Sequence, residues 1–144
     1  MRNIDTIVLH MSYTPPSRDI GAADIRRWHV NDQGWRDIGY HWVIRRGGAI
    51  EQGRPETERG AHVAGHNAHS LGICLVGGRA EDAQVVECNY TLHQWDALRE
   101  LLSELSIRYP LARIVGHNDL VARGCPGFNA KTLYWRPEHE DANG

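Results

Sequence analysis

The sequence has few cysteines, no long apolar run and no targeting segment. Its three cysteines, Cys74, Cys88 and Cys125, are odd in number and irregularly spaced, so they do not form a disulfide framework. This favours a reducing compartment at synthesis. No apolar run is long enough to cross a membrane, and the N-terminus lacks the apolar core of a signal peptide. We therefore expect a protein that is cytoplasmic when synthesised and does not insert into a membrane.

The sequence also lacks a block of like charges. Lys and Arg number 16 and Asp and Glu number 18, which gives a formal net charge of -2. This balance provides no basic face for a nucleic-acid partner. Repeats, linkers and low-complexity tracts are absent as well. A chain of 144 residues is therefore expected to form one domain, residues 1–144.

Hydrophobic periodicity predicts alternating strands and helices. Two segments have helical spacing, and the second begins at the capping residue Thr91: they are Asp19–Asn31 and Thr91–Arg108. Short apolar segments between turn residues predict five strands: Thr6–Met11, Tyr40–Arg45, Ala49–Gln52, Leu71–Val76 and Ala112–Val115. Arg54–Ser70 has no periodicity and is predicted to be a long functional loop. The pattern indicates an α/β domain whose single mixed sheet is flanked by helices.

A possible metal site lies near the C-terminus. His117 precedes Cys125 in a segment that ends in the turn residues Pro126 and Gly127. His10, at the end of the first predicted strand, is the leading candidate for a third ligand. Two imidazoles and a thiolate suit zinc and leave a fourth position for water, as a hydrolytic site requires.

Other interpretations of these residues remain open. Taken singly, His10 is as well explained as a hydrogen-bonded core histidine, and Cys125 as a small buried apolar residue. Alternatively, Cys125 is a nucleophile and His117 its base, without a metal. That arrangement gives His10 no role.

Two further residues near this site have suitable chemistry. The phenol of Tyr40 can donate a hydrogen bond to an oxyanion or position water, although a half-buried aromatic on a strand is the simpler interpretation. Arg123, two residues before Cys125, stays protonated, so it can stabilise negative charge but cannot act as a base. A solvated loop charge explains Arg123 equally well.

Several motifs along the chain resemble those of a known family. They are His29, Gly34–Trp35, Ile38–Trp42, Gly48–Pro55, Gly60–Asn67, Ser70–Gly78, Gly116–Asp119 and Cys125–Pro126. Together they resemble the zinc N-acetylmuramoyl-L-alanine amidases, which include small phage endolysins and, more distantly, the peptidoglycan recognition proteins. The resemblance is collinear from about Ile7 to Phe128 and covers nearly the whole chain.

The resemblance implies a mixed sheet flanked by helices, with a zinc-containing cleft on one side. It implies that His10, His117 and Cys125 bind the zinc and that Tyr40 matches the catalytic tyrosine. Phage members often have lysine at the position of Arg123. The arginine of this chain keeps the positive charge but, unlike lysine, does not release a proton. The cleft would bind substrate through His29, His62, His66 and Asn67.

The expected reaction is hydrolysis of the amide between N-acetylmuramic acid and L-alanine in peptidoglycan. A small single domain without a signal fits a monomeric phage endolysin, which reaches the wall after another protein opens the membrane. The alternative is a peptidoglycan-binding or regulatory module without hydrolysis. Loss of the cysteine ligand would favour that alternative, and Cys125 is present.

Overall fold

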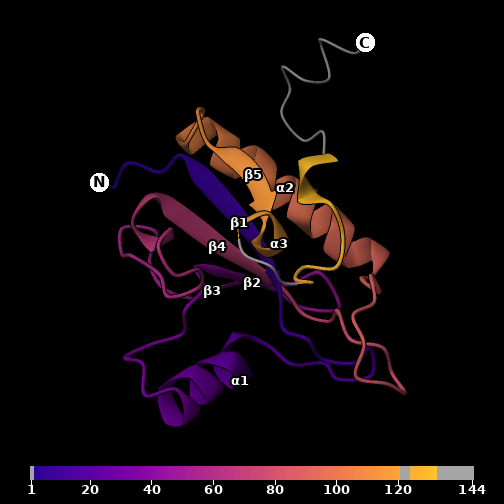
Figure 1. Ribbon diagram of the computed structural model, residues 1–144. Coiled ribbons are helices and arrows are strands. Elements are labelled where there is room, and N and C mark those ends of the chain that lie inside the picture. The colour runs from indigo at the N-terminus through magenta and orange to yellow at the C-terminus, as the bar shows by residue number, and fades with distance from the viewer. Residues whose placement is uncertain (1, 121–123, 133–144) are drawn as a thin grey trace, which may run out of the picture.

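The computed structural model describes residues 2–120 and 124–132 of the chain. Its centre is a five-stranded sheet in the order β3-β2-β4-β1-β5 (Figure 1). The strands are β1 (Thr6–Met11), β2 (Trp42–Ile44), β3 (Ile50–Gln52), β4 (Ser70–Leu75) and β5 (Arg113–Gly116). β1 pairs in parallel with β4 and β5, and β4 with β2, whereas β3 is antiparallel to β2. The predicted α/β fold with a mixed sheet is confirmed.

Helices cover both faces of this sheet. The longer elements are α1 (Ala22–Arg27), which continues into η1 (Trp28–Asp32), and α2 (Leu92–Arg108). Three short elements complete the described helices: η2 (Asn67–His69), α3 (His117–Leu120) and η3 (Ala130–Thr132). Figure 1 shows α1 and α2 separated by the sheet.

Alternation along β1 separates the main core from the site. Ile7 and Leu9 are fully buried in the core cluster that includes the apolar stripe of α2. Val8 lies in a different cluster, with Val63 and Val115. Since side chains alternate along a strand, His10 lies on the same face as Val8, away from α2.

The first helix begins later than predicted. Asp19 and Ile20 precede it, and the backbone N–H of Gly21 donates to the Asp24 carboxylate at 3.0 Å. The N–H of Ala22 donates to the Glu51 carboxylate at 2.8 Å, so the side chain from β3 satisfies a free donor of the first turn. These tertiary contacts set the start at Ala22. The helix then widens into the π turn η1 instead of continuing regularly to Asn31.

The second long helix begins and ends as predicted. The Oγ1 of Thr91 accepts from the N–H of Gln94 at 3.0 Å, and the Gln94 carboxamide oxygen accepts from the N–H of Thr91 at 3.0 Å. This reciprocal pair satisfies two donors at the helix start. The buried Gln94 amide also donates to the carbonyls of Ile44 and Val76, at 3.2 and 2.8 Å. The cap therefore anchors α2 to the ends of two strands.

β1 has the predicted bounds, and the boundaries of the other four strands differ from the predicted ones by at most two residues. β2 and β4 are Trp42–Ile44 and Ser70–Leu75, whereas the predictions were Tyr40–Arg45 and Leu71–Val76. A tight turn at Gly47 and Gly48 joins β2 to β3. The N–H of Gly48 donates to Arg45 O at 2.9 Å, and Gly48 has φ +96°. Hairpin turns favour glycine in that left-handed conformation.

The long loop between β3 and β4 is tied to the rest of the domain. The Arg2 guanidinium donates to the carbonyls of Glu56, Asn67 and Ser70 at 2.9 to 3.2 Å. The buried Arg54 donates to the carbonyls of Ile38 and Arg59, at 2.6 and 2.8 Å. Apart from η2, the loop lacks regular structure, as predicted. These bonds hold in place a segment that the sheet does not order.

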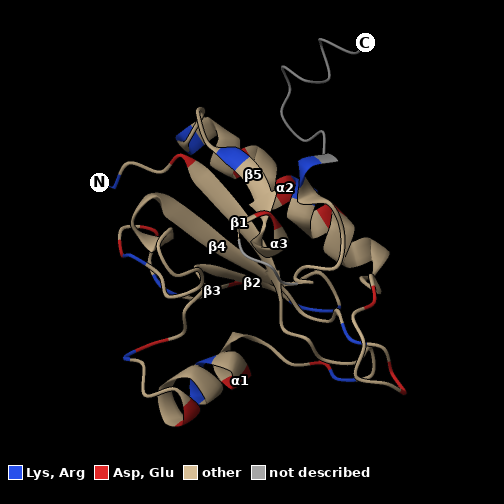
Figure 2. Ribbon diagram, viewed as in Figure 1, with Lys and Arg blue, Asp and Glu red and all other residues tan. Residues whose placement is uncertain are grey.

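The two central strands carry no charged residue. In Figure 2, acidic and basic residues alternate along the helices and loops, while β1 and β4 carry neither. Within the described residues, none of the helices has the length and apolar character needed to cross a membrane.

Candidate active site

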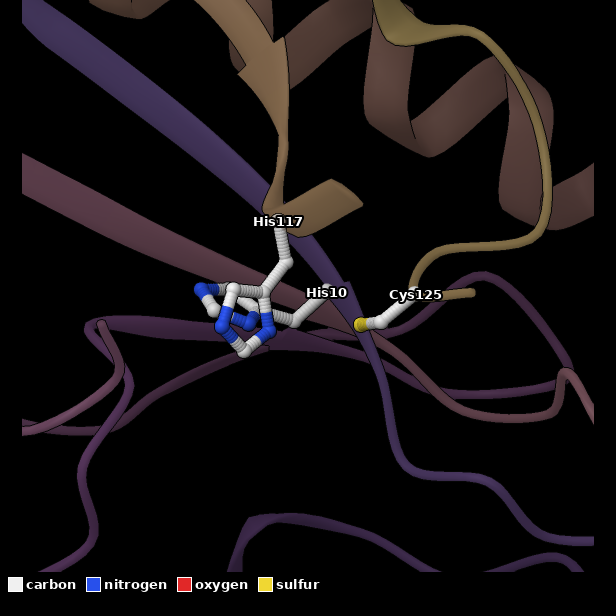
Figure 3. Close-up of side chains that lie close together, drawn as sticks. All are labelled: His10, His117 and Cys125. Atoms are coloured by element: carbon white, nitrogen blue, oxygen red, sulfur yellow. The ribbon is translucent and has the colours of Figure 1, made fainter. Parts of the chain in front are cut away.

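Three elements deliver the predicted metal ligands to one point. His10 lies near the end of β1, His117 begins α3 directly after β5, and Cys125 follows on the next loop. Their ligand atoms all lie within 4.8 Å of one another, as Figure 3 illustrates. Because β1 and β5 are adjacent parallel strands, their carboxyl ends meet at the same edge of the sheet. This is the physical reason that residues 107 positions apart converge.

The surroundings favour the ligand forms of these side chains. Burial lowers the pKa of His10 well below its ordinary value, and charge on His62 or His117 would lower the pKa further. His10 is therefore neutral at pH 7 and has a lone pair to share. The Sγ of Cys125 accepts the backbone N–H of Met11 at 3.0 Å. A hydrogen bond to sulfur favours the thiolate, which is the metal-binding form.

The donor set fits zinc. Two neutral imidazoles and one thiolate are typical zinc ligands, and a three-residue set leaves one tetrahedral position for water or substrate. His10 is 1% exposed and Cys125 is 9% exposed, so both are shielded on the protein side. The cluster nevertheless borders an open cleft of about 500 Å³, to which all three ligands contribute. A metal here would be reachable by a large substrate.

Tyr40 lies beside this cluster. Its ring centroid is 5.0 Å from that of His10, and it lines the same cleft. Burial raises the pKa of Tyr40 well above its ordinary value, and the nearby thiols of Cys74 and Cys125 raise the pKa further. The phenol therefore stays protonated at neutral pH and is a hydrogen-bond donor. Arg123, the other predicted catalytic residue, lies outside the described residues.

The four residues predicted to bind substrate occupy different positions. His29 lines the cleft with Trp35, their ring centroids 4.6 Å apart, and its Nδ1 accepts the N–H of Gly39 at 2.9 Å. His62 also lines the cleft but is only 8% exposed. Its Nδ1 lies 2.9 Å from the Nε2 of His10.

The other two residues have different surroundings. The Oδ1 of Asn67 accepts the backbone N–H groups of His62 and Val63, each at 3.0 Å, although Asn67 also borders an adjacent hollow. His66 packs edge-on against His69, with ring centroids 5.7 Å apart. His66 does not line the part of the cleft around His10 that the described residues form. Substrate binding by these residues stays a prediction.

Some residues of the site were not identified from the sequence. Tyr13 lines the cleft and has φ 56°, an uncommon backbone conformation for a residue with a side chain. Ser70 lies within 3.2 Å of the His62 ring and is completely buried. The one sequence signal for Ser70 was a small polar residue at the start of an apolar strand. That signal is too common to be specific.

Comparisons with known proteins agree with this geometry. The family model described as N-acetylmuramoyl-L-alanine amidase matches residues 1–128. The endolysin of Klebsiella phage KP32 is 42% identical over 132 residues, which span 92% of this chain and 86% of the relative. The endolysin of Escherichia phage T7 is 40% identical over 134 residues, which span 93% and 87%.

Solved structures show the same similarity. The N-acetylmuramoyl-L-alanine amidase LysC from Clostridium intestinale superimposes with a TM-score of 0.76 at 31% identity, covering 96% of this chain and 83% of LysC. A Drosophila PGRP-LB mutant in complex with tracheal cytotoxin superimposes with a TM-score of 0.75 at 25% identity, covering 90% and 78%. Matches in sequence and in fold thus lead to the same conclusion: the chain belongs to the N-acetylmuramoyl-L-alanine amidase family and is an amidase of peptidoglycan.

Proposed function

We propose that this amidase is zinc-dependent, with His10, His117 and Cys125 as the metal ligands, and that it cleaves the amide between N-acetylmuramic acid and L-alanine. The observation that supports this most directly is the convergence of the three ligand atoms within 4.8 Å at the border of an open cleft. The composition of the cluster also favours a zinc site over a cysteine nucleophile. A Cys125–His117 pair alone would not account for the adjacent, neutral His10.

The protein residues divide the work of hydrolysis. When bound, zinc supplies Lewis acidity, which activates water and polarises the carbonyl of the scissile amide. Tyr40 donates its phenol proton in a hydrogen bond to the oxygen that gains negative charge. The buried, neutral imidazoles and the thiolate hold their donor atoms without competing protons. The N–H of Met11 donates to the sulfur of Cys125, which favours the thiolate over the thiol.

The lining of the cleft suits a glycopeptide. Its volume of about 500 Å³ is bordered by aromatic side chains, including Trp35, Tyr13 and His29. Aromatic faces pack against the apolar faces of sugar rings, and the histidines offer hydrogen bonds to a peptide. The binding of tracheal cytotoxin by PGRP-LB supports a muropeptide as the ligand of this chain too. We assign the contacts to His29, His62, His66 and Asn67.

The relatives indicate the biological setting. The similar phage proteins are endolysins, which supports a role in breaking the cell wall during phage lysis. We propose that the protein is a monomer, is made in the cytoplasm and reaches the wall after another protein has permeabilised the membrane. Arg123 would add positive charge near the site, where it would stabilise the transition state.

Metal analysis combined with wall digestion tests the proposal. The purified protein should contain one zinc ion per chain and release peptides with a free N-terminal L-alanine from cell walls. Cys125→Ser should lose both zinc and peptide release. Cys88→Ser, at an exposed thiol, is the matched control and should keep both. A metal-free Cys125→Ser variant that still released such peptides would contradict the mechanism, and wall binding without any release would favour a non-hydrolytic module.

A further inference from the structure

A chain of buried hydrogen bonds connects His10 to the backbone through two side chains. The Oγ of Ser70 donates to the carbonyl of His66 at 2.7 Å. The same Oγ lies 3.2 Å from the Nε2 of His62. The Nδ1 of His62 lies in turn 2.9 Å from the Nε2 of His10. Ser70 is 0% exposed and His10 is 1% exposed, so bulk water does not compete for these groups.

The direction of each bond follows from the proton count. A serine hydroxyl has one proton, and in Ser70 it is used on the carbonyl of His66. The Oγ of Ser70 therefore accepts, which requires a proton on the Nε2 of His62. The Nδ1 of neutral His62 is then an acceptor, so the Nε2 of His10 must carry a proton and donate to it. Neutral His10 has one ring proton, and its Nδ1 is left with the lone pair.

We propose that Ser70 and His62 are positioning residues that fix the tautomer of His10, so that its Nδ1 is the atom offered to zinc. This inference rests on the proposed zinc site. The partner of His10 is a second histidine, where a carboxylate or carbonyl is usual. The neutral His62 imidazole can accept a hydrogen bond on Nδ1 only while its proton is on Nε2, which donates to Ser70. Both ring nitrogens of His62 thus serve the support of a ligand, while the ring also borders the cleft.

The backbone is shaped to hold the His62 ring in this position. A Cβ on Gly72 would lie 2.7 Å from the Cγ of His62, and a Cβ on Gly60 would lie 2.8 Å from its Cδ2. The ring therefore fills space that two absent side chains leave open. On β4, Gly72 is paired with Val8 and Cys74 with His10, which places the open space next to His10 on the same face. The Oδ1 of Asn67 accepts the backbone N–H of His62 and so fixes the backbone at that residue.

The tautomer can be measured without metal or substrate. Long-range ¹⁵N–¹H spectra of the metal-free protein distinguish imidazoles protonated on Nε2 from those protonated on Nδ1. We expect His10 and His62 both to be protonated on Nε2. In Ser70→Ala the proton of His62 should no longer be confined to Nε2, whereas Ser106→Ala, which removes a comparable 2.7 Å bond to a backbone carbonyl on α2, should leave both rings unchanged.

Zinc affinity provides the second readout. Loss of the outer partner of a ligating histidine lowers metal affinity about 10–100-fold, so we expect a fall of that size in His62→Leu by competition with a chromophoric chelator. In His62→Gln the side-chain oxygen can accept from His10 and the amide can donate to Ser70. The affinity of His62→Gln should therefore stay close to that of the wild type, and the visible spectrum of its Co²⁺ form should match.

Three outcomes would overturn the inference: His10 protonated on Nδ1 in the wild type, equal zinc affinities in wild type and His62→Leu, or equal losses in the Leu and Gln variants. The protonation site of His10 can be determined in the wild type even if His62→Leu does not fold. A wild type that binds no zinc would overturn the proposed function as well. A zinc-binding wild type with His10 protonated on Nδ1 would overturn this inference alone.

Discussion

The backbone N–H of Met11 donates to the Sγ of Cys125 at 3.0 Å, across 114 positions of sequence. β1 thus serves the proposed metal site twice, because it carries His10 and the peptide group that donates to Cys125. The bond joins the most regular part of the molecule to the loop that follows α3. It explains how a cysteine on an irregular segment is held in place for a metal.

Removal of zinc should lower thermal stability as well as activity. A ligand that binds only the folded state stabilises it by about 4 kcal/mol when its concentration is 1,000 times Kd. Dialysis against a chelator should therefore lower the Tm by several degrees and abolish peptide release, and stoichiometric Zn²⁺ should restore both. Mg²⁺ is the control, because it prefers oxygen ligands and should restore neither. If the Tm did not change after verified removal of the metal, bound zinc would not stabilise the folded protein.

Tyr40→Phe should separate catalysis from metal binding. Tyr40 lies beside His10 but is not one of the proposed ligands. Removal of its hydroxyl should therefore leave zinc content and fold unchanged. Loss of one oxyanion donor lowers kcat about 10²–10³-fold. Turnover of a soluble muropeptide and elemental analysis of the same sample test this expectation. If Tyr40→Phe kept full kcat, Tyr40 would be a cleft-lining residue without a part in the reaction.

Acid should destabilise the domain through His41. This buried ring accepts the N–H of Gly72 on its Nδ1 at 3.0 Å, and burial lowers its pKa to about 4. The unfolded chain has a histidine pKa of about 6.5, so below that pH the unfolded state binds a proton that the folded state does not. Stability from this group is complete above about pH 6.5 and is lost as the pH falls to about 4, by roughly 2–4 kcal/mol.

Denaturant unfolding of the metal-free protein at a series of pH values measures this effect. His41→Gln should have a smaller pH slope between pH 6.5 and 4 than the wild type, because glutamine does not titrate. His93→Gln, at an exposed residue of α2, is the matched control and should keep the wild-type slope. Equal slopes for the wild type and His41→Gln would mean that other groups cause the acid sensitivity.

The interior face of α2 should contribute far more stability than its outer face. Leu105 is 0% exposed within the main core, whereas Ile107, two residues later, is 80% exposed. Leu105→Ala should lower the free energy of unfolding by about 2–5 kcal/mol, because it removes buried methyl groups and leaves a cavity. Ile107→Ala should change the free energy by less than about 0.5 kcal/mol. Chemical denaturation of both variants measures the contrast, and similar losses would indicate a second contact surface on α2.

Local patterns in the sequence determined much of the fold. The apolar run of Thr6–Met11, the glycines at 47 and 48 and the cap at Thr91 each act over a few residues, so their consequences can be read from neighbours alone. The metal ligands could also be proposed, because two histidines and a cysteine together suit zinc and fall in motifs that resemble the amidase family. The late start of α1 could not, since a carboxylate from β3 sets it.

The roles of the loop histidines depended on tertiary structure. His62, His66 and Asn67 lie within six residues of one another and look alike as polar loop residues. Only the folded chain places His62 against His10, 52 positions away, turns Asn67 toward the backbone of His62, and leaves His66 against His69. The sequence by itself therefore determined which chemistry was present. Tertiary structure decided which imidazole supports which, because a hydrogen bond depends on distances in space that no local pattern encodes.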